Sequence, residues 1–465
     1  MQGERGHGDL ALVALLRAFH RLSTWRRAKW VGVNVGGWLL LEYGPSTPLF
    51  QNQGADYNGE WSFAEMLRGK GIAEEVFAEH RARHITADEL RRIAAVGLNA
   101  IRVPFGYWIV TGPSCDDPFL GPCVEELDRI VAIAEELGLA VMLDLHGNPG
   151  GETENACCGR EKPDWQFDNW RREEALSILG VVARRYAHTE NVVAIQVCNE
   201  PSPSIPPSGL VEHYAAAARA VREGGMPADR VAVICPLYYS DADTKTEFMR
   251  LWLDAYAQLD NCVLDLHPYY FGDWADRSNG GPLMRQVADK AHELAVRCPA
   301  SVVGEWSAAL PPDTWELGDD GAPSSSEWFA LQLHLWSAAT THGSFFWCWA
   351  DNSGPDWCLR ASVPGRRTAI AAAAAAAPPV WTANCSWPTK EASILEALEK
   401  QGEAKRRLDE ALHNALADGA DDPVEHVAAG LLEQMPQPQL EAAVARLQAE
   451  LARRSPQTDH ATSLS

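Results

Sequence analysis

The amino-acid sequence predicts an α/β protein built on a closed (β/α)8 barrel, or TIM barrel, with a C-terminal helical extension. Three observations predict it: eight short apolar runs recur along the chain, helical patterns separate several of them, and the runs are apolar on both faces, as strands of a buried parallel sheet are. The runs are WVGVNVG (30–36), LNAIRVP (98–104), LAVMLDLH (139–146), VVAIQVCNE (192–200), RVAVICP (230–236), CVLDLHPYY (262–270), SVVGEW (301–306) and SFFWCWA (344–350).

The segments between strands have the spacing of amphipathic helices. Apolar residues recur at i, i+3 and i+4 in TADELRRIAAVG (86–97), VEELDRIVAIAEELG (124–138) and REEALSILGVVARRYA (172–187), and glycine ends the first two. The alternative, an open doubly wound sheet, would need a glycine-rich phosphate turn after its first strand. GVNVGGW (32–38) has glycines without the GxGxxG spacing, so the sequence favours the closed barrel.

The 465 residues suffice for one large domain and an appendage. We expect an N-terminal extension at 1–24, the barrel at 25–368, an Ala/Pro-rich linker at 369–385 and a helical module at 386–465. The helices of this module are amphipathic and would not be stable alone. They are therefore predicted to pack on the barrel or on a second copy, which makes a homodimer through the C-terminal helices one expectation.

Composition argues against several partners. The net charge of −23 disfavours nucleic acid, which is bound through Lys and Arg. The 11 cysteines lack metal-site spacing, so no metal is predicted. The pair Cys157–Cys158 could form disulfides with Cys115 or Cys123, or all could be free thiols. No run reaches the roughly 18–20 apolar residues of a membrane span. The apolar run before Arg17 is too short for a signal sequence, and the compartment stays open.

Polar or aromatic side chains occur at the carboxyl ends of seven predicted strands, the face that carries the active site of such barrels. A single strand-end Glu, His or Trp is most often solvated or packed, but such a set on one face predicts a site. The residues are Glu42, Arg102, His146, Asn199, Glu200, His267, Tyr269, Glu305, Trp306, Trp347 and Trp349.

The chemistry that fits is a pair of carboxylates across the barrel mouth. Glu200 and Glu305 come from opposite strands, and retaining glycosidases place such a pair about 5–5.5 Å apart. One must be protonated and the other ionised, and Arg102 is placed to keep one ionised. No metal or organic cofactor is needed. Supporting roles are expected for Asn199 (on a sugar 2-hydroxyl), His146 and His267 (on other hydroxyls), Tyr269 (on the nucleophile) and Trp347 (as a flat floor for the sugar).

Seven motifs in order across about residues 30–360 resemble those of glycoside hydrolase family 5, nearest to its exo-β-1,3-glucanase branch. The resemblance implies a (β/α)8 barrel of retaining enzymes acting on β-glucans, with Glu200 as acid/base and Glu305 as nucleophile. It also implies that Arg102, His146, Asn199, His267, Tyr269 and Trp347 form the invariant site and that Glu42 lies in the first sugar pocket. The motifs are NVGGWLLLE (34–42), GLNAIRVPFGYW (97–108), DPFLGPCVEELDRIVAIAEELGLAVMLDLHGNPGG (117–151), NEP (199–201), LHPYYF (266–271), VVGEWSAAL (302–310) and FFWCWADNSGPDW (345–357).

Two segments depart from that branch. PGGETENACCG (149–159) replaces a PGSQNGFDNSG-like loop, so the Phe and Asp that shape the closed glucose pocket are missing near Asn155 and Ala156. WADN (349–352) replaces the lysine-bearing WKTE. The reaction class is unaffected, but the exo mode and the β-1,3 preference stay open. The alternatives are an endo-β-1,4-glucanase, a mannanase, a glycolipid glucosidase, a transglycosylase, or a carbohydrate-binding protein without turnover.

Overall fold

The computed structural model describes residues 29–376, apart from 57–58, 115–116, 257, 271–286, 288–289, 292, 296–297, 299 and 311–324. It confirms the barrel: eight strands pair in parallel in chain order, and β8 closes against β1. The strands are β1 (Trp30–Asn34), β2 (Ala100–Gly106), β3 (Ala140–Gly147), β4 (Val192–Gln196), β5 (Ala232–Pro236), β6 (Cys262–Leu266), β7 (Ser301–Trp306) and β8 (Gly343–Phe346).

Every strand residue is buried, because one face points into the barrel and the other is covered by helices. Side chains alternate along a strand, so Met142, Asp144 and His146 of β3 share the inner face. At the level of Met142 the interior is apolar, and the ring of Phe345 fills the space beside Gly32. A Cβ at Gly32 would lie 2.3 Å from that ring, so this close approach requires glycine.

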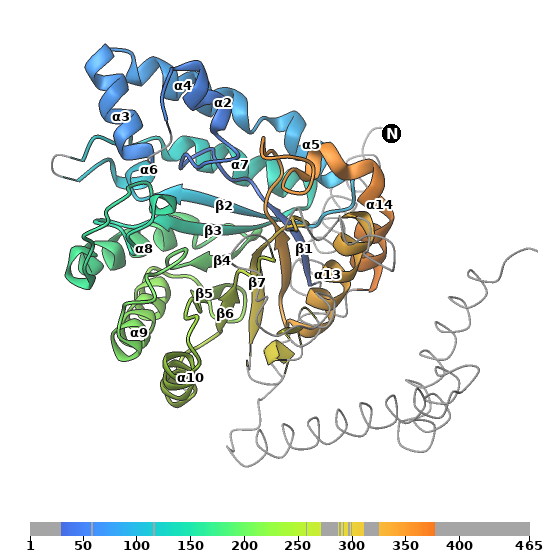
Figure 1. Ribbon diagram of the computed structural model, residues 1–465. Helices are drawn as coiled ribbons and strands as arrows, with labels where there is room; N and C mark the ends of the chain where they lie inside the picture. The colour runs from blue at the N-terminus through green and yellow to red at the C-terminus, as the bar shows by residue number, and fades with distance from the viewer. Residues whose placement is uncertain are drawn as a thin grey trace, which may run out of the picture. The chain divides into compact units, whose positions relative to one another are not determined.

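Helices surround the strands (Figure 1). The three predicted helical segments are confirmed, and their ends follow local chemistry: the Thr86 hydroxyl accepts from the Glu89 N–H at the start of α5, and Gly138 at φ 74° ends α7. The helices are α5 (Ala87–Ala95), α6 (Trp108–Thr111), α7 (Val124–Leu137), α8 (Arg172–Tyr186), α9 (Pro207–Glu223), α10 (Ala242–Tyr256), α13 (Ser325–Ala339) and α14 (Leu359–Ala376), with short 3-10 turns η1 (Ala156–Cys158) and η2 (Phe167–Asn169).

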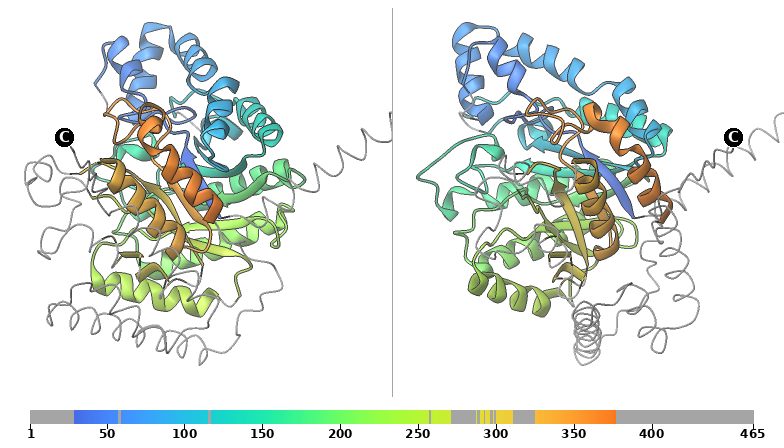
Figure 2. Two further views of the ribbon diagram at one scale, coloured as in Figure 1. Left: turned by 90° about the vertical axis from the view of Figure 1, so that its right-hand side faces the viewer. Right: turned by 45° about the vertical axis from the view of Figure 1, so that its right-hand side comes forward.

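Three further helices lie between β1 and α5, and the sequence patterns did not predict them. They are α2 (Thr47–Asn52), α3 (Gly59–Lys70) and α4 (Ala73–His84), and they stay together in every view (Figure 2). Phe50, Phe63 and Phe77 form their apolar core. Ring nitrogens of His80 and His84 bond the carbonyls of Gly37 and Gly36, so this group fixes the loop that follows β1.

The predicted linker begins inside α14, which continues to Ala376. The remaining linker residues, the helical module and the N-terminal extension lie outside the described residues, so these boundaries and the homodimer stay predictions. The chain divides into two compact units, 1–386 and 387–465. Among the described helices, none is long and apolar enough to cross a membrane. Cys123, Cys157 and Cys158 are free thiols, and Cys115 lies outside the described residues.

Candidate active site

Arg102 of β2 lies at the centre of the barrel mouth with no exposed surface. Its guanidinium bonds side chains from four other strands or strand ends, a use of the planar fork that lysine could not reproduce. Burial alone would lower the pKa of Arg102, but Asp144, Glu305 and Asp265 outweigh it and keep the group charged. The acceptors are Asn34 Oδ1 (2.8 Å), Gln196 Oε1 (2.7 Å), Asn199 Oδ1 (2.8 Å) and Glu305 Oε1 (2.7 Å), and Asp144 Oδ2 forms an ion pair with the guanidinium at 2.9 Å.

Glu305 of β7 is held as a carboxylate. Its Oε1 accepts from Arg102, and its Oε2 accepts from the Tyr269 hydroxyl at 2.8 Å and lies 3.7 Å from His267 Nδ1. Burial would raise the pKa of Glu305, but His267, Arg102 and the Tyr269 hydrogen bond together lower it. A buried, ionised oxygen pair fixed by three partners is suited to act as a nucleophile.

Glu200 follows β4 and has different surroundings. Its Oε1 lies 2.8 Å from His267 Nδ1, and among the described residues no arginine or lysine bonds its carboxyl. Ligand atoms of Glu200, His267 and Glu305 lie within 4.8 Å of one another, so the two carboxyl groups face the same space. The geometry therefore brings together the pair predicted from the sequence.

The residues predicted to bind the first sugar lie near this pair. His146 Nε2 lies 3.4 Å from Glu42 Oε1, and the His146 ring is stacked on Trp347 at 6.1 Å between centroids. Burial raises the pKa of Glu42, and His146 offsets only part of that rise. Trp347, Tyr269 and the half-buried Trp357 pack together as an aromatic wall.

Comparison with known proteins places this site in a family. The family model for cellulase (glycosyl hydrolase family 5) matches residues 67–353. The chain belongs to glycoside hydrolase family 5. It is therefore a retaining β-glycosidase, and the sequence-based assignment is confirmed.

Two similar proteins are named as glucan 1,3-beta-glucosidases. The chain is 31% identical over 300 residues to a probable glucan 1,3-beta-glucosidase A of Aspergillus clavatus, covering 64% of this chain and 69% of that protein. It is 28% identical over 368 residues to a glucan 1,3-beta-glucosidase of Blumeria graminis, covering 70% and 83%. The rutinosidase structure from Aspergillus niger matches with a TM-score of 0.58 at 17% identity, over 74% of this chain and 98% of that one, and shows the fold alone.

The structure brings Glu42, Arg102, His146, Asn199, Glu200, His267, Tyr269, Glu305 and Trp347 to one mouth, but it does not bring two other strand-end aromatics there. Trp306 follows an inward residue on β7 and therefore points outward, 5.1 Å from both Phe329 and Phe346. Trp349 donates its Nε1–H to Glu89 of α5 at 2.6 Å. Both are packing residues of this family 5 barrel.

The sequence reading missed three residues around the acid pair. Burial, with the Glu200 carboxylate nearby, raises the pKa values of both Tyr238 and Cys157, so both stay protonated. Tyr238 follows β5, the strand for which no site residue was predicted. Glu152 has no exposed surface and accepts the backbone N–H groups of Asn148 (3.2 Å) and Asn199 (3.3 Å). Burial raises the pKa of Glu152 to about 7.

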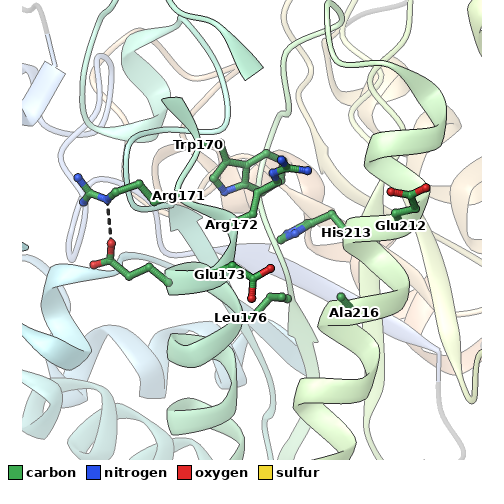
Figure 3. Close-up of a pocket in the computed structure, with 9 residues that line it drawn as sticks. Trp170, Arg171, Arg172, Glu173, Leu176, Glu212, His213 and Ala216 are labelled. Carbon is green, nitrogen blue, oxygen red and sulfur yellow. Dashed lines mark ion pairs between the residues drawn. The ribbon is translucent and has the colours of Figure 1, made fainter. Parts of the chain in front are cut away.

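A second hollow, of about 540 Å³, lies between α8 and α9 and is lined by Trp170, Arg172, Glu173, Glu212 and His213 (Figure 3). None of the candidate site residues lines it. Nε1 of Trp170 and both ring nitrogens of His213 have no hydrogen-bond partner among the described residues, but these atoms are buried beneath the surface. A molecule in the hollow would not reach them, so we assign it no role.

Proposed function

We propose that the protein hydrolyses β-glucans as a glucan exo-β-1,3-glucosidase-like enzyme, by double displacement with Glu305 as nucleophile and Glu200 as acid/base. The unequal surroundings of the two carboxyl groups carry the proposal. Glu305 is fixed and ionised by Arg102, Tyr269 and His267, whereas Glu200 contacts only His267 among these groups. The named activity of the relatives supports the glucan substrate.

In the first step a Glu305 oxygen attacks the anomeric carbon while Glu200 gives its proton to the leaving glycosidic oxygen. The carbon–oxygen bond to the leaving sugar breaks, and a glycosyl ester on Glu305 forms. Glu305 is already ionised and desolvated by its fixed partners, so little reorganisation accompanies the attack. The leaving sugar carries away the proton of Glu200, which becomes a carboxylate.

In the second step Glu200 accepts a proton from water, and the water oxygen attacks the anomeric carbon from the face that the leaving sugar vacated. The ester bond to Glu305 breaks, and the product keeps the original configuration because two inversions have occurred. Glu200 ends protonated and Glu305 ionised, as at the start.

The remaining residues bind the sugar in this proposal. Asn199 is fixed by Arg102 and offers its amide N–H to the 2-hydroxyl, whose hydrogen bond strengthens as charge develops on the ring. Glu42 and His146 bind the hydroxyls farther from the reacting carbon. Trp347 provides the flat surface, since aromatic faces pack against the C–H face of a sugar.

The test is hydrolysis of an aryl β-glucoside by wild type, Glu305→Gln and Glu200→Gln, with Glu173→Gln, an exposed glutamate of α8, as control. We expect kcat to fall at least about 10³-fold for Glu305→Gln and about 10²–10⁴-fold for Glu200→Gln, with no change in the control. Equal rates in all four proteins would refute the assignment. For specificity, laminarin should give glucose alone, and a ladder of oligosaccharides would indicate endo action instead.

A further inference from the structure

The inner wall of the barrel contains the same tripeptide twice. Asp144-Leu145-His146 lies on β3, and Asp265-Leu266-His267 spans the end of β6. Both leucines pack into the outer core, so the aspartate and the histidine of each triplet face the barrel interior. In both triplets the aspartate carboxylate lies one layer below the histidine ring and has no exposed surface.

Each ring lies between two carboxyl groups. His146 has Nδ1 at 2.6 Å from Asp144 Oδ2, and its Nε2, which has no hydrogen-bond partner among the described residues, lies 3.4 Å from Glu42 Oε1. His267 has Nε2 at 3.1 Å from Asp265 Oδ2 and Nδ1 at 2.8 Å from Glu200 Oε1. A neutral imidazole has a single N–H and cannot donate on both sides, whereas an imidazolium can.

The two aspartates are themselves fixed in place by further contacts. Asp144 Oδ2 forms an ion pair with Arg102 Nη2 at 2.9 Å. Asp265 accepts the backbone N–H of Gly304 at 2.5 Å and the Gln196 amide at 3.0 Å. A Cβ on Gly304 would lie 2.3 Å from the Asp265 carboxylate, so glycine is required for this approach.

We propose that Asp144 and Asp265 are positioning residues that keep His146 and His267 as imidazolium cations. Each ring donates one N–H down to its aspartate, and His267 donates its other N–H up to Glu200. The proposal rests on the function proposed above for the role of Glu200 and Glu305. The proposal also determines which oxygen of Glu200 carries the acid proton. Because the Nδ1–H of His267 bonds Oε1 of Glu200, the proton is on the other oxygen, Oε2.

The charges around the rings agree with this. Burial alone would lower the pKa of His267, but Glu305, Asp265 and Glu200 outweigh it and raise the pKa to about 10. For His146, Glu42 and Asp144 likewise outweigh burial and raise the pKa.

Arg102 is a cation that contacts the same carboxylates as the two rings, Asp144 beside His146 and Glu305 beside His267. It is neutralised by its own contacts with Asp144 and Glu305. Glu152 also faces His146 and carries negative charge when it is ionised.

The test is titration of the ring nitrogens by ¹⁵N NMR in wild type, Asp144→Asn and Asp265→Asn. The signals are assigned among the 14 histidines with His146→Gln and His267→Gln. We expect both rings to be doubly protonated at pH 7 in wild type. Asp265→Asn should lower the pKa of His267 by about one unit or more and leave that of His146 nearly unchanged, and Asp144→Asn should do the reverse. Each variant therefore serves as the control for the other.

A neutral ring in wild type at pH 7, or a pKa that does not move in its own variant, would overturn the proposal. Leu266→Val, which alters packing within the second triplet without removing charge, should leave both titrations in place, and a shift as large as that of Asp265→Asn would also count against it. The readout needs no turnover, so its failure is distinct from failure of the proposed function. On the alkaline side of the pH profile, the kcat/KM of Asp265→Asn should fall at a lower pH than that of wild type. The reason is that His267 loses its proton at a lower pH in the variant.

Discussion

Two layers of the barrel interior, built by the same strands, follow opposite rules. In the lower layer Ala100, Met142, Ala194, Val263 and Phe345 pack as an apolar core. One side-chain level closer to the mouth, the interior is almost entirely polar and charged, and Arg102 forms ion pairs with both Asp144 and Glu305. Burying an unpaired charge costs several kcal/mol, roughly, whereas the lower layer is stabilised by its apolar contacts alone. The polar layer therefore contributes little to the stability of the fold. Its presence is explained by the chemistry at the barrel mouth.

Among the substitutions that test this contrast between the two layers, we expect Arg102→Met to have the largest effect. It leaves the carboxylates of Asp144 and Glu305 buried without their cation, so we expect about 3–5 kcal/mol of lost stability and at least about 10³-fold lower kcat. Chemical denaturation and kinetics with an aryl β-glucoside measure both. Full activity in a folded Arg102→Met protein would show that the polar layer is not catalytic machinery.

Tyr269→Phe should have a smaller and more specific effect. The Tyr269 hydroxyl donates to Glu305 and helps to lower its pKa, so its loss should raise the pKa of Glu305. Glu305 must be ionised to react. On the acid side of the pH profile, the activity of the variant should therefore fall at a higher pH than that of wild type. We expect kcat/KM to fall about 10–100-fold, the range of a hydrogen bond to a charged group. A lower kcat/KM with an unmoved acid limb would contradict the assigned contact.

Glu152→Gln sharpens the comparison, because Glu152 is a buried carboxyl group with no cation bonded to it among the described residues. Its pKa is raised from 4.5 to about 7, so the folded state resists ionisation and stability should fall as pH rises from about 4.5 to 7. The variant should remove this dependence of Tm on pH, with an effect of only a few-fold on kcat. Glu154→Gln, in the same loop, is the matched control, and an equal flattening there would refute the claim.

The smallest effect on turnover is expected from Met142→Ala in the lower layer. It leaves a cavity and should cost about 2–5 kcal/mol of stability, measured by denaturation. The kcat of the folded protein should stay near that of wild type. A loss of kcat comparable to that of Tyr269→Phe would mean that the two layers are not separable.

Much of the fold and site follows from periodicity. The β-branched runs give the strands, and the ends of the runs give His146, Glu200 and Glu305 without knowledge of their contacts. Arg102 lies within its run and was found because it is the one charged residue there. Asp144 and Asp265 were missed because they lie inside apolar runs, although the repeated Asp-Leu-His was visible.

Helices α2 to α4 and the residues Glu152, Cys157 and Tyr238 were missed because they belong to connections, where no periodicity applies. Trp349 was misplaced because β8 ends at Phe346 and alternation stops there.

The central claim is that Glu305 forms a covalent bond to the sugar while Glu200 handles the proton. The most direct measurement is to incubate the enzyme with a 2-deoxy-2-fluoro-β-glucosyl fluoride, which forms the intermediate but hydrolyses slowly, and to map the adduct by peptide mass spectrometry. We predict one fluoroglucosyl group per chain, on Glu305, and none in Glu305→Gln. An adduct on another residue, or turnover of substrates with inversion and no adduct, would contradict the account.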